Sequence, residues 1–342
     1  MQIITTKKEL MATVLACKNA SKTIGLVPTM GALHEGHASL VRRAVNENNV
    51  CFVSVFVNPT QFNNKEDLAK YPRNIRRDAE LLSSIGADFV FAPTPEEMYS
   101  AEEMNSTFSF DFNGLDQVME GKMRPGHFNG VVQVVSRLFY LVKPDKAYFG
   151  DKDFQQLAII HYMVERSELA GTFGHLQIVD CPIVREPSGL ALSSRNERLS
   201  EEEKHTALAI SKTLFDSLQW AKEPGATVAQ VQQRVIDTIN ATPFPTPHNH
   251  CTPNPQDNNN DCTLNPQDNN KDCTPNPQNN NNDGTPNPQN NNNDGNKRAL
   301  EVEYYEIVDR KTLLPTDTFT NAIGCVTVYC GPVRLIDNIQ YN

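Results

Sequence analysis

No stretch of the 342-residue sequence approaches the roughly 18 consecutive apolar residues that a membrane-spanning helix requires. The start is polar and contains Lys7, Lys8 and Glu9, which does not fit the apolar centre of a signal peptide. Blocks of Lys and Arg are lacking too, and 31 basic against 41 acidic residues give a net charge of −10. We therefore expect a soluble protein that binds neither a membrane nor nucleic acid.

No C-x-x-C pair occurs among the eight cysteines, so neither a zinc knuckle nor a thioredoxin-type redox pair is indicated. A reducing, cytoplasmic compartment fits this cysteine usage best. Cys325 and Cys330 lie five residues apart in the strand-like run GCVTVYCG. Their side chains should point to opposite faces of the strand and should not pair with each other.

Apolar side chains are nearly absent from residues 252–295, which are four 11-residue units such as TPNPQNNNNDG. Leu264 is the one aliphatic residue of this repeat, whereas solenoid repeats bury apolar positions between neighbouring units. The composition therefore predicts a disordered, low-complexity insertion. A metal site is the disfavoured alternative, because the spacing of its candidate ligands matches no known pattern: His248, His250, Cys251, Cys262 and Cys273.

Upstream of the repeat, apolar runs alternate with helical patterns, which is typical of βαβ units around a parallel sheet. We expect strands at 23–28, 51–57, 87–93, 146–150 and 175–184, with helices at 37–45, 66–85, 126–142 and 153–170. The fold class is α/β, a Rossmann-like doubly wound sheet. The length predicts about two domains, and we place the first at 1–182.

The second expected domain, 183–342, is a smaller α+β unit that the repeat interrupts. Two helices begin there with capping boxes, one formed by Ser200 with Glu203 and the other by Thr227 with Gln230. After the repeat, strands are expected at 299–309, 322–330 and 333–338. Together these elements predict two helices beside a small sheet.

The first expected strand ends in VPTMGALHEGHASL, where the chain turns into a helix whose first turn carries His37, three residues after His34. Ligands of α/β proteins bind beyond the carboxyl ends of the strands, and helix N-termini attract anions. Two histidines at this spacing can face the same side and donate to phosphate oxygens. A phosphate is therefore expected here, although a surface pair that caps the helix would show the same spacing.

Seven blocks together resemble the pantothenate synthetase family, within the nucleotidyltransferase superfamily that carries the H-x-G-H signature. They cover essentially everything outside the repeat: PTMGALHEGH (28–37), FVNPTQF (56–62), YPR (71–73), RPGHFNGV (124–131), FGDKDFQQL (149–157), VREPSGLALSSRN (184–196) and RLIDN (334–338).

This resemblance implies a ligase that joins pantoate to β-alanine at the expense of ATP, through a pantoyl adenylate, with release of AMP and pyrophosphate. It implies Mg²⁺ held through the ATP phosphates rather than by a protein metal site, and a homodimer. The second domain would act as a lid over a nucleotide- and pantoate-binding first domain.

The resemblance also implies the site residues. The catalytic groups would be His34, His37, Lys152 and Arg195. ATP would contact Met30, Gly31, Ala32, Leu33, His34, Glu35, Gly36, His37, Gly150, Asp151, Lys152, Asp153, Val184, Leu192, Ser193, Ser194 and Arg195. Pantoate would contact Gln61 and Gln156, and β-alanine would contact Gln61, Asn58, Arg124 and His127.

The chain departs from the family pattern in two places: Asp151 stands where Glu is expected, and Lys122 and Met123 replace small residues. Neither removes a named catalytic group. One alternative is another adenylyltransferase of the superfamily, which should show extra basic residues for a phosphorylated acceptor, where this chain offers Gln61 and Gln156. The other is a non-catalytic nucleotide-binding scaffold, which would not need His34, His37, Lys152 and Arg195 together.

Overall fold

The computed structural model describes residues 1–63, 65–105, 108–166, 171–243 and 299–341. The repeat at 252–295, for which the composition predicts disorder, lies outside these residues. The histidines and cysteines between 248 and 273 lie outside them as well.

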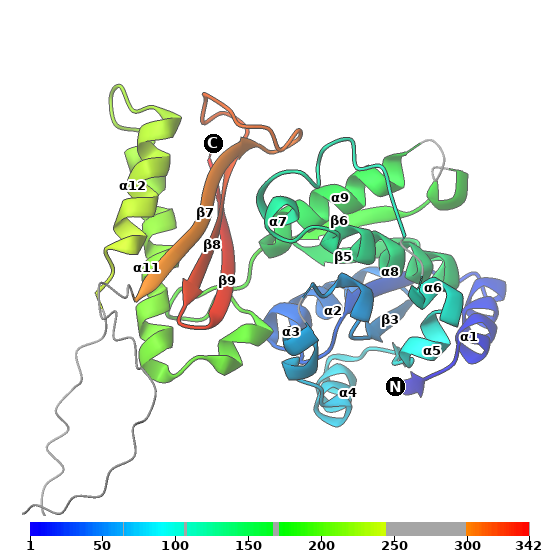
Figure 1. Cartoon of the computed structure of the whole chain (residues 1–342). Coiled ribbons are helices and arrows are strands. Elements are labelled where there is room, and N and C mark those ends of the chain that lie inside the picture. The colour runs from blue at the N-terminus through cyan, green and yellow to red at the C-terminus, as the bar shows by residue number, and fades with distance from the viewer. Residues whose placement is uncertain (64, 106–107, 167–170, 244–298, 342) are drawn as a thin grey trace, which may run out of the picture. The chain divides into compact units, whose positions relative to one another are not determined.

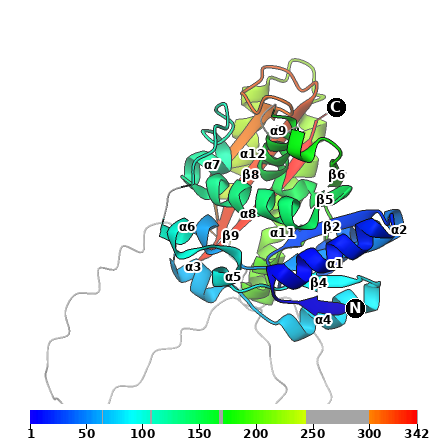
Figure 2. The ribbon, with the colours of Figure 1, turned by 90° about the vertical axis from the view of Figure 1, so that its right-hand side faces the viewer.

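A six-stranded parallel sheet spans the N-terminal part of the described chain (Figure 1; turned by 90° in Figure 2). Across the sheet the strands are β1 (Gln2–Ile4), β4 (Phe89–Phe91), β3 (Val50–Val55), β2 (Ile24–Thr29), β5 (Lys146–Gly150) and β6 (Gln177–Cys181). From β2 the chain first moves outward through β3 and β4, and it later resumes on the other side of β2 with β5 and β6. This order confirms the doubly wound fold and gives a topological switch point between β2 and β5.

The strands are buried on both faces, which is why their sequences read as continuous apolar runs. In β2, Leu26 packs into the cluster on one face and Val27 into the cluster on the other, because successive side chains alternate. Helices α1 (Lys7–Asn19), α8 (His127–Val142) and α9 (Phe154–Glu165) cover the first face. Helices α2 (Glu35–Glu47) and α4 (Ile75–Ile85) cover the second face.

The single helix expected at 66–85 is wrong, because the structure has two helices there. The first is α3 (Lys65–Lys70) and the second is α4, which starts at Ile75. Pro72 lies between them. Proline disfavours helical backbone at the residue before it and lacks the N–H that would continue the helix, so the pattern is interrupted.

Strand β1 and helix α1 have no counterpart among the elements expected from the sequence. Helix α1 buries Leu10 and Val14, whereas Met11 and Leu15 are exposed. Its apolar residues therefore do not mark one face, and the period of the helix is hard to recognise.

Shorter elements connect the strands and helices and carry several of the expected site residues. The short α-helices are α5 (Pro95–Met98), α6 (Ala101–Asn105) and α7 (Met119–Met123). The 3₁₀ turns are η1 (Pro59–Gln61), η2 (Asp151–Asp153) and η3 (Ser194–Arg198). Because η1 follows β3 and η2 follows β5, both lie at carboxyl ends of parallel strands.

The C-terminal strands β7 (Leu300–Asp309), β8 (Ala322–Cys330) and β9 (Val333–Gln340) form an antiparallel sheet. Helices α11 (Glu201–Trp220) and α12 (Val228–Asn240) cover one of its faces, and both begin with the capping boxes expected from the sequence. Cys325 and Cys330 are buried in clusters on opposite faces of β8, as predicted. The division into domains at residue 182 stays a prediction.

Helix α8 approaches the backbone of η1 so closely that only glycine fits at Gly130. A Cβ there would lie 2.5 Å from the carbonyl oxygen of Thr60 and 2.6 Å from the backbone nitrogen of Gln61. We predict that Gly130→Ala lowers the free energy of unfolding by about 1–3 kcal/mol, because η1 must shift. Gly171→Ala is the matched control, since its added Cβ meets nothing within 4 Å. Equal unfolding midpoints for wild type and Gly130→Ala would contradict this close packing.

Candidate active site

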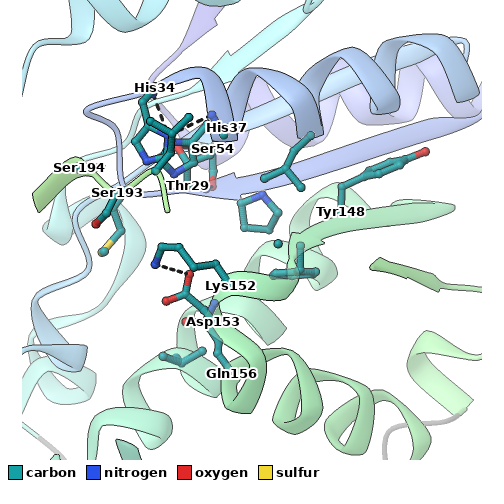
Figure 3. Close-up of a pocket in the computed structure, with 18 of the residues that line it drawn as sticks. Thr29, His34, His37, Ser54, Tyr148, Lys152, Asp153, Gln156, Ser193 and Ser194 are labelled. Carbon is teal, nitrogen blue, oxygen red and sulfur yellow. Dashed lines mark hydrogen bonds and ion pairs between the residues drawn. The ribbon is translucent and has the colours of Figure 1, made fainter. Parts of the chain in front are cut away.

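A cavity of about 220 Å³ lies at the carboxyl edge of the parallel sheet (Figure 3). Its lining includes Thr29 at the end of β2, Ser54 near the end of β3 and Gly150 at the end of β5. The cavity therefore lies at the topological switch point, where ligands of doubly wound sheets bind.

Two imidazole rings close the N-terminus of α2 at this cavity. His34 is the N-cap residue, and its Nδ1 accepts the N–H of Gly36 at 3.1 Å. The Nδ1 of His37 accepts the N–H of His34 at 3.4 Å, and the ring centroids are 4.1 Å apart. The rings thus form a reciprocal capping box and face the same side, as the spacing predicted. Because each Nδ1 is an acceptor, a neutral ring must carry its proton on Nε2.

Both rings are neutral near neutral pH. Burial lowers the pKa of His34 to about 4, and the positive charge of Lys152 lowers it further. Burial, the neighbouring His34 and Lys152 lower the pKa of His37 to about 3. Near neutral pH the pair therefore offers two Nε2–H donors and no positive charge.

The turn before α2 is fixed by Asp78, a buried residue of α4 that the sequence did not reveal as part of the site. Its carboxylate accepts the N–H of Ala32 at 3.0 Å and that of Leu33 at 2.8 Å. Ala32 and Leu33, which the family resemblance assigned to ATP, thus direct their backbone N–H groups at Asp78. Gly31 adopts a φ of +83°, and a Cβ there would lie 2.9 Å from Asp78 Oδ2. Glycine suits this close approach.

The residues between Met30 and His37 that were expected to contact ATP do not all face the cavity. Met30, His34, Gly36 and His37 line the cavity. Glu35 is exposed and forms an ion pair with Arg42 along α2. Its carboxylate therefore interacts away from the cavity.

Lys152 and Asp153 lie across the cavity from the histidine pair (Figure 3). Both belong to η2, which follows β5 directly, and Lys152 Nζ lies 3.4 Å from Asp153 Oδ2. Asp151 is half-buried on the same turn, and burial together with Asp180 raises the pKa of its carboxyl. Of the expected η2 residues, Lys152 and Asp153 thus face the cavity.

The loop after β6 supplies a third side of the cavity. Val184, Leu192, Ser193, Ser194 and Arg195 all line it. The N–H of Leu192 donates to the carbonyl of Val184 at 3.0 Å, so the two ends of the loop are joined. Ser194 Oγ donates to the carbonyl of Ala32 at 3.0 Å. This bond fixes the loop against the turn that precedes α2.

The two expected pantoate residues, Gln61 and Gln156, also line the cavity. Gln61 is buried at the end of η1, and Gln156 lies in the first turn of α9. Asn58 lies behind Gln61: its Nδ2 donates to Gln61 Oε1 at 3.3 Å, and its Oδ1 accepts the hydroxyl of Tyr99 at 2.9 Å. The side chain of Asn58 therefore orients Gln61 and is 1% exposed.

Arg124 and His127 line a second cavity of about 50 Å³, which shares four lining residues with the first: Lys152, Asp153, Gln156 and Arg195. His127 Nδ1 lies 2.8 Å from the carbonyl oxygen of Gln61, and Arg124 Nη1 lies 3.3 Å from His127 Nε2. Burial and Arg124 lower the pKa of His127 to about 4. The residues expected for pantoate and for β-alanine are thus neighbours.

Comparison with known proteins identifies the family. A family model described as pantoate-beta-alanine ligase matches residues 2–340. The chain belongs to the pantoate-beta-alanine ligase family. A pantothenate synthetase of Phocaeicola vulgatus is 48% identical over 100% of this chain and 99% of that protein. One from Bacteroides fragilis is 47% identical with the same coverage.

Solved structures of this ligase family share the fold. Pantothenate synthetase from Thermus thermophilus is 34% identical, covers 100% of both chains and superposes with a TM-score of 0.76. The pantoate-beta-alanine ligase of Francisella tularensis, solved with beta-gamma ATP and β-alanine, is 27% identical with a TM-score of 0.68. The alignment with it covers 99% of this chain and 97% of that chain. These findings confirm the resemblance seen in the sequence motifs.

Two negative findings concern the described residues alone. Among their helices, none combines the length and the apolar character needed to span a bilayer. Within the same residues, no group of three or more His, Cys, Asp or Glu side chains is arranged to hold a metal ion.

The neutral histidine pair makes stability depend on pH in a defined direction. A histidine whose folded pKa lies below the ordinary value of 6.5 binds more protons when unfolded. The free energy of unfolding therefore falls as the pH drops from about 6.5 toward about 4, by up to about 1.4 kcal/mol per pH unit for each group. Denaturant unfolding at about pH 7 and about pH 5 should show a smaller loss in His34→Gln/His37→Gln than in wild type. An equal loss would contradict the neutral state.

Proposed function

We propose that this chain joins pantoate to β-alanine at the expense of ATP, through an enzyme-bound pantoyl adenylate, and releases pyrophosphate and AMP. Family membership supports the ligase chemistry. The observation that carries the proposal is the lining of one cavity, which brings together two imidazoles that carry Nε2–H donors, the ammonium of Lys152 and the two glutamine amides. Phosphate-binding and hydroxyl-binding groups thus meet in one space.

The triphosphate binds between the N-terminus of α2 and η2. Attack of the pantoate carboxylate on the α-phosphorus forms one P–O bond and breaks the P–O bond to pyrophosphate, and negative charge spreads over the phosphate oxygens. His34 and His37 donate hydrogen bonds to these oxygens, and Lys152 supplies a point charge. Ser193 and Arg195 add a hydroxyl and a guanidinium from the third side. The hydroxyl of Ser194 donates to the carbonyl of Ala32, so it would have to turn away from Ala32 to meet a phosphate oxygen.

Because its pKa is low, His37 is suited to act as a hydrogen-bond donor rather than as a general acid. A ring with a pKa of about 3 is neutral near pH 7, so it enters the reaction without a proton to release from a cationic state. Its Nε2–H can still stabilise charge on the leaving pyrophosphate. Transfer of a proton from His37 to pyrophosphate would require bound nucleotide to raise this pKa.

The acceptor side of the cavity suits a small hydroxy acid. Gln61 and Gln156 can both donate to and accept from the two hydroxyls of pantoate. Val134, Val135 and Leu138 of α8 line the same cavity and offer apolar contact for its two methyl groups. An acceptor with a phosphate would require further cations here, so this set of residues favours pantoate over the other adenylyltransferase substrates.

The residues present fit magnesium bound through ATP. Asp153 is the one carboxylate among the described residues that line the main cavity. Magnesium is usually held by one or two carboxylates together with substrate phosphates and waters, so the ATP phosphates would hold it together with Asp153. When bound, the ion would offset part of the phosphate charge. We further propose β-alanine contacts from Arg124 and His127 and a homodimer, as the family resemblance implies, and a cytoplasmic location, as the cysteine usage indicates.

A non-catalytic nucleotide-binding scaffold is the second candidate, and one measurement separates it from the ligase. With an adenylate intermediate, labelled pyrophosphate should exchange into ATP when pantoate and magnesium are present and β-alanine is absent. A scaffold shows no exchange. Exchange that requires β-alanine would contradict an adenylate and would favour a concerted reaction.

Lys152→Ala and His37→Ala should each lower the turnover of this exchange roughly 10²- to 10³-fold, because each removes a donor to developing charge. Lys146→Ala is the matched control. Lys146 begins the same strand, forms an ion pair with Glu47 at 2.9 Å and lies at the opposite end of β5 from the cavity. Near-normal exchange in Lys152→Ala would show that its assigned role is wrong.

A further inference from the structure

The RLIDN segment near the end of β9 contacts the turn that carries Lys152. Asn338 is buried, and its side-chain Nδ2 donates to the carbonyl oxygen of Asp151 at 2.8 Å and to that of Lys152 at 3.1 Å. These carbonyls belong to the first two residues of η2. One amide group of the C-terminal sheet therefore holds the backbone on which Lys152 stands.

Asp337, the preceding residue, holds the loop on another side of the cavity. Its carboxylate accepts two hydrogen bonds from Arg185, at 2.6 and 2.9 Å, and is buried. Arg185 follows Val184 at the start of the loop that carries Arg195. Asp337 Oδ1 also accepts the N–H of Asn338 at 2.8 Å. Asp337 and Asn338 together are thus hydrogen-bonded to two sides of the cavity, the loop after β6 and the turn η2.

Side-chain chemistry explains why an amide suits this position. An Asn Nδ2 carries two hydrogens, and each can go to one carbonyl oxygen. An aspartate of the same shape would place carboxylate oxygens against two carbonyl oxygens, with no hydrogen between them. The two carbonyl contacts therefore favour asparagine over aspartate at position 338.

We propose that Asn338 is a positioning residue for Lys152, which it holds at the reacting phosphate through the backbone of η2. The inference rests on the proposed function, because it assumes that Lys152 stabilises the phosphoryl transition state. Displacement of a catalytic group by about 1 Å can cost roughly 10²-fold in rate, so two hydrogen bonds to its own peptide units matter.

The test measures pantoate-dependent pyrophosphate exchange in Asn338→Ala and Asn338→Asp. We expect turnover in Asn338→Ala to fall roughly 10- to 100-fold with little change in KM for pantoate, and at least as far in Asn338→Asp. In the Lys152→Ala background, Asn338→Ala should cause little further loss, since residues that act through one group are not additive. Unchanged turnover in Asn338→Ala would overturn the proposal. So would a double variant whose loss of turnover equals the product of the losses in the two single variants.

Asn240→Ala controls for stability. Asn240 Oδ1 accepts the N–H of Val302 at 2.9 Å, so the variant loses a comparable bond between a side chain and the backbone, away from the cavity. It should keep wild-type turnover even if its unfolding midpoint falls as far as that of Asn338→Ala. If turnover followed the unfolding midpoint in all variants, Asn338 would be merely structural and the proposal overturned.

Two outcomes keep the proposal separate from the function on which it rests. Wild-type protein without pantoate-dependent exchange overturns the proposed function and, with it, the role of Asn338. Wild-type exchange that Lys152→Ala abolishes and Asn338→Ala leaves intact overturns the role of Asn338 alone. If neither substitution at Asn338 yields a folded chain, the residue is a folding determinant and the positioning role is overturned.

Discussion

The chemistry of the site depends on how the first turn of α2 satisfies its free N–H groups. Helix N-termini are usually capped by hydroxyl or carboxylate oxygens. Here two imidazole nitrogens accept instead, from Gly36 and from His34. The cap thereby fixes the tautomer of both rings, and their Nε2–H groups remain for a ligand. The same two side chains thus cap the helix and, in the proposed reaction, donate to phosphate oxygens.

This turn remains fixed only because distant parts of the chain contact it. Asp78 of α4 binds its backbone, and Ser194 connects it to the loop after β6. On the opposite side of the cavity, Asn338 holds η2. The three sides of the cavity are thus each fixed by hydrogen bonds from another element, which is the preorganisation that charge stabilisation requires.

An ion-pair cluster connects α7 to the C-terminal sheet beside the second cavity. Burial opposes ionisation of Glu120, but hydrogen bonds and charge from Arg334 outweigh it and lower the pKa of this carboxyl to about 2. Arg334 also pairs with Glu303 of β7 at 2.5 Å. A buried ion pair adds little net stability but requires a defined geometry. The cluster therefore orients α7, and with it the start of the segment that contains Arg124.

Local patterns predicted most of the fold and the histidine pair, whereas the family resemblance supplied the other expected lining residues. The strand at 146–150 and the capping boxes of α11 and α12 matched because short-range chemistry determines them. The same was true of His34 and His37, whose spacing alone places them on one side. Asp78 and Asn338 could not be found this way. They act on residues 46 and 187 positions away, and no local pattern marks such a partner.

Transfer of oxygen-18 from pantoate tests most directly whether the carboxylate attacks the α-phosphorus in this cavity. Pantoate labelled in its carboxylate is converted with ATP and β-alanine, and the AMP is analysed by mass spectrometry. An adenylate requires one labelled oxygen in AMP, because the amine breaks the bond between the acyl carbon and that oxygen. AMP without label would contradict the adenylate mechanism and, with it, the assignment of the histidine pair and Lys152.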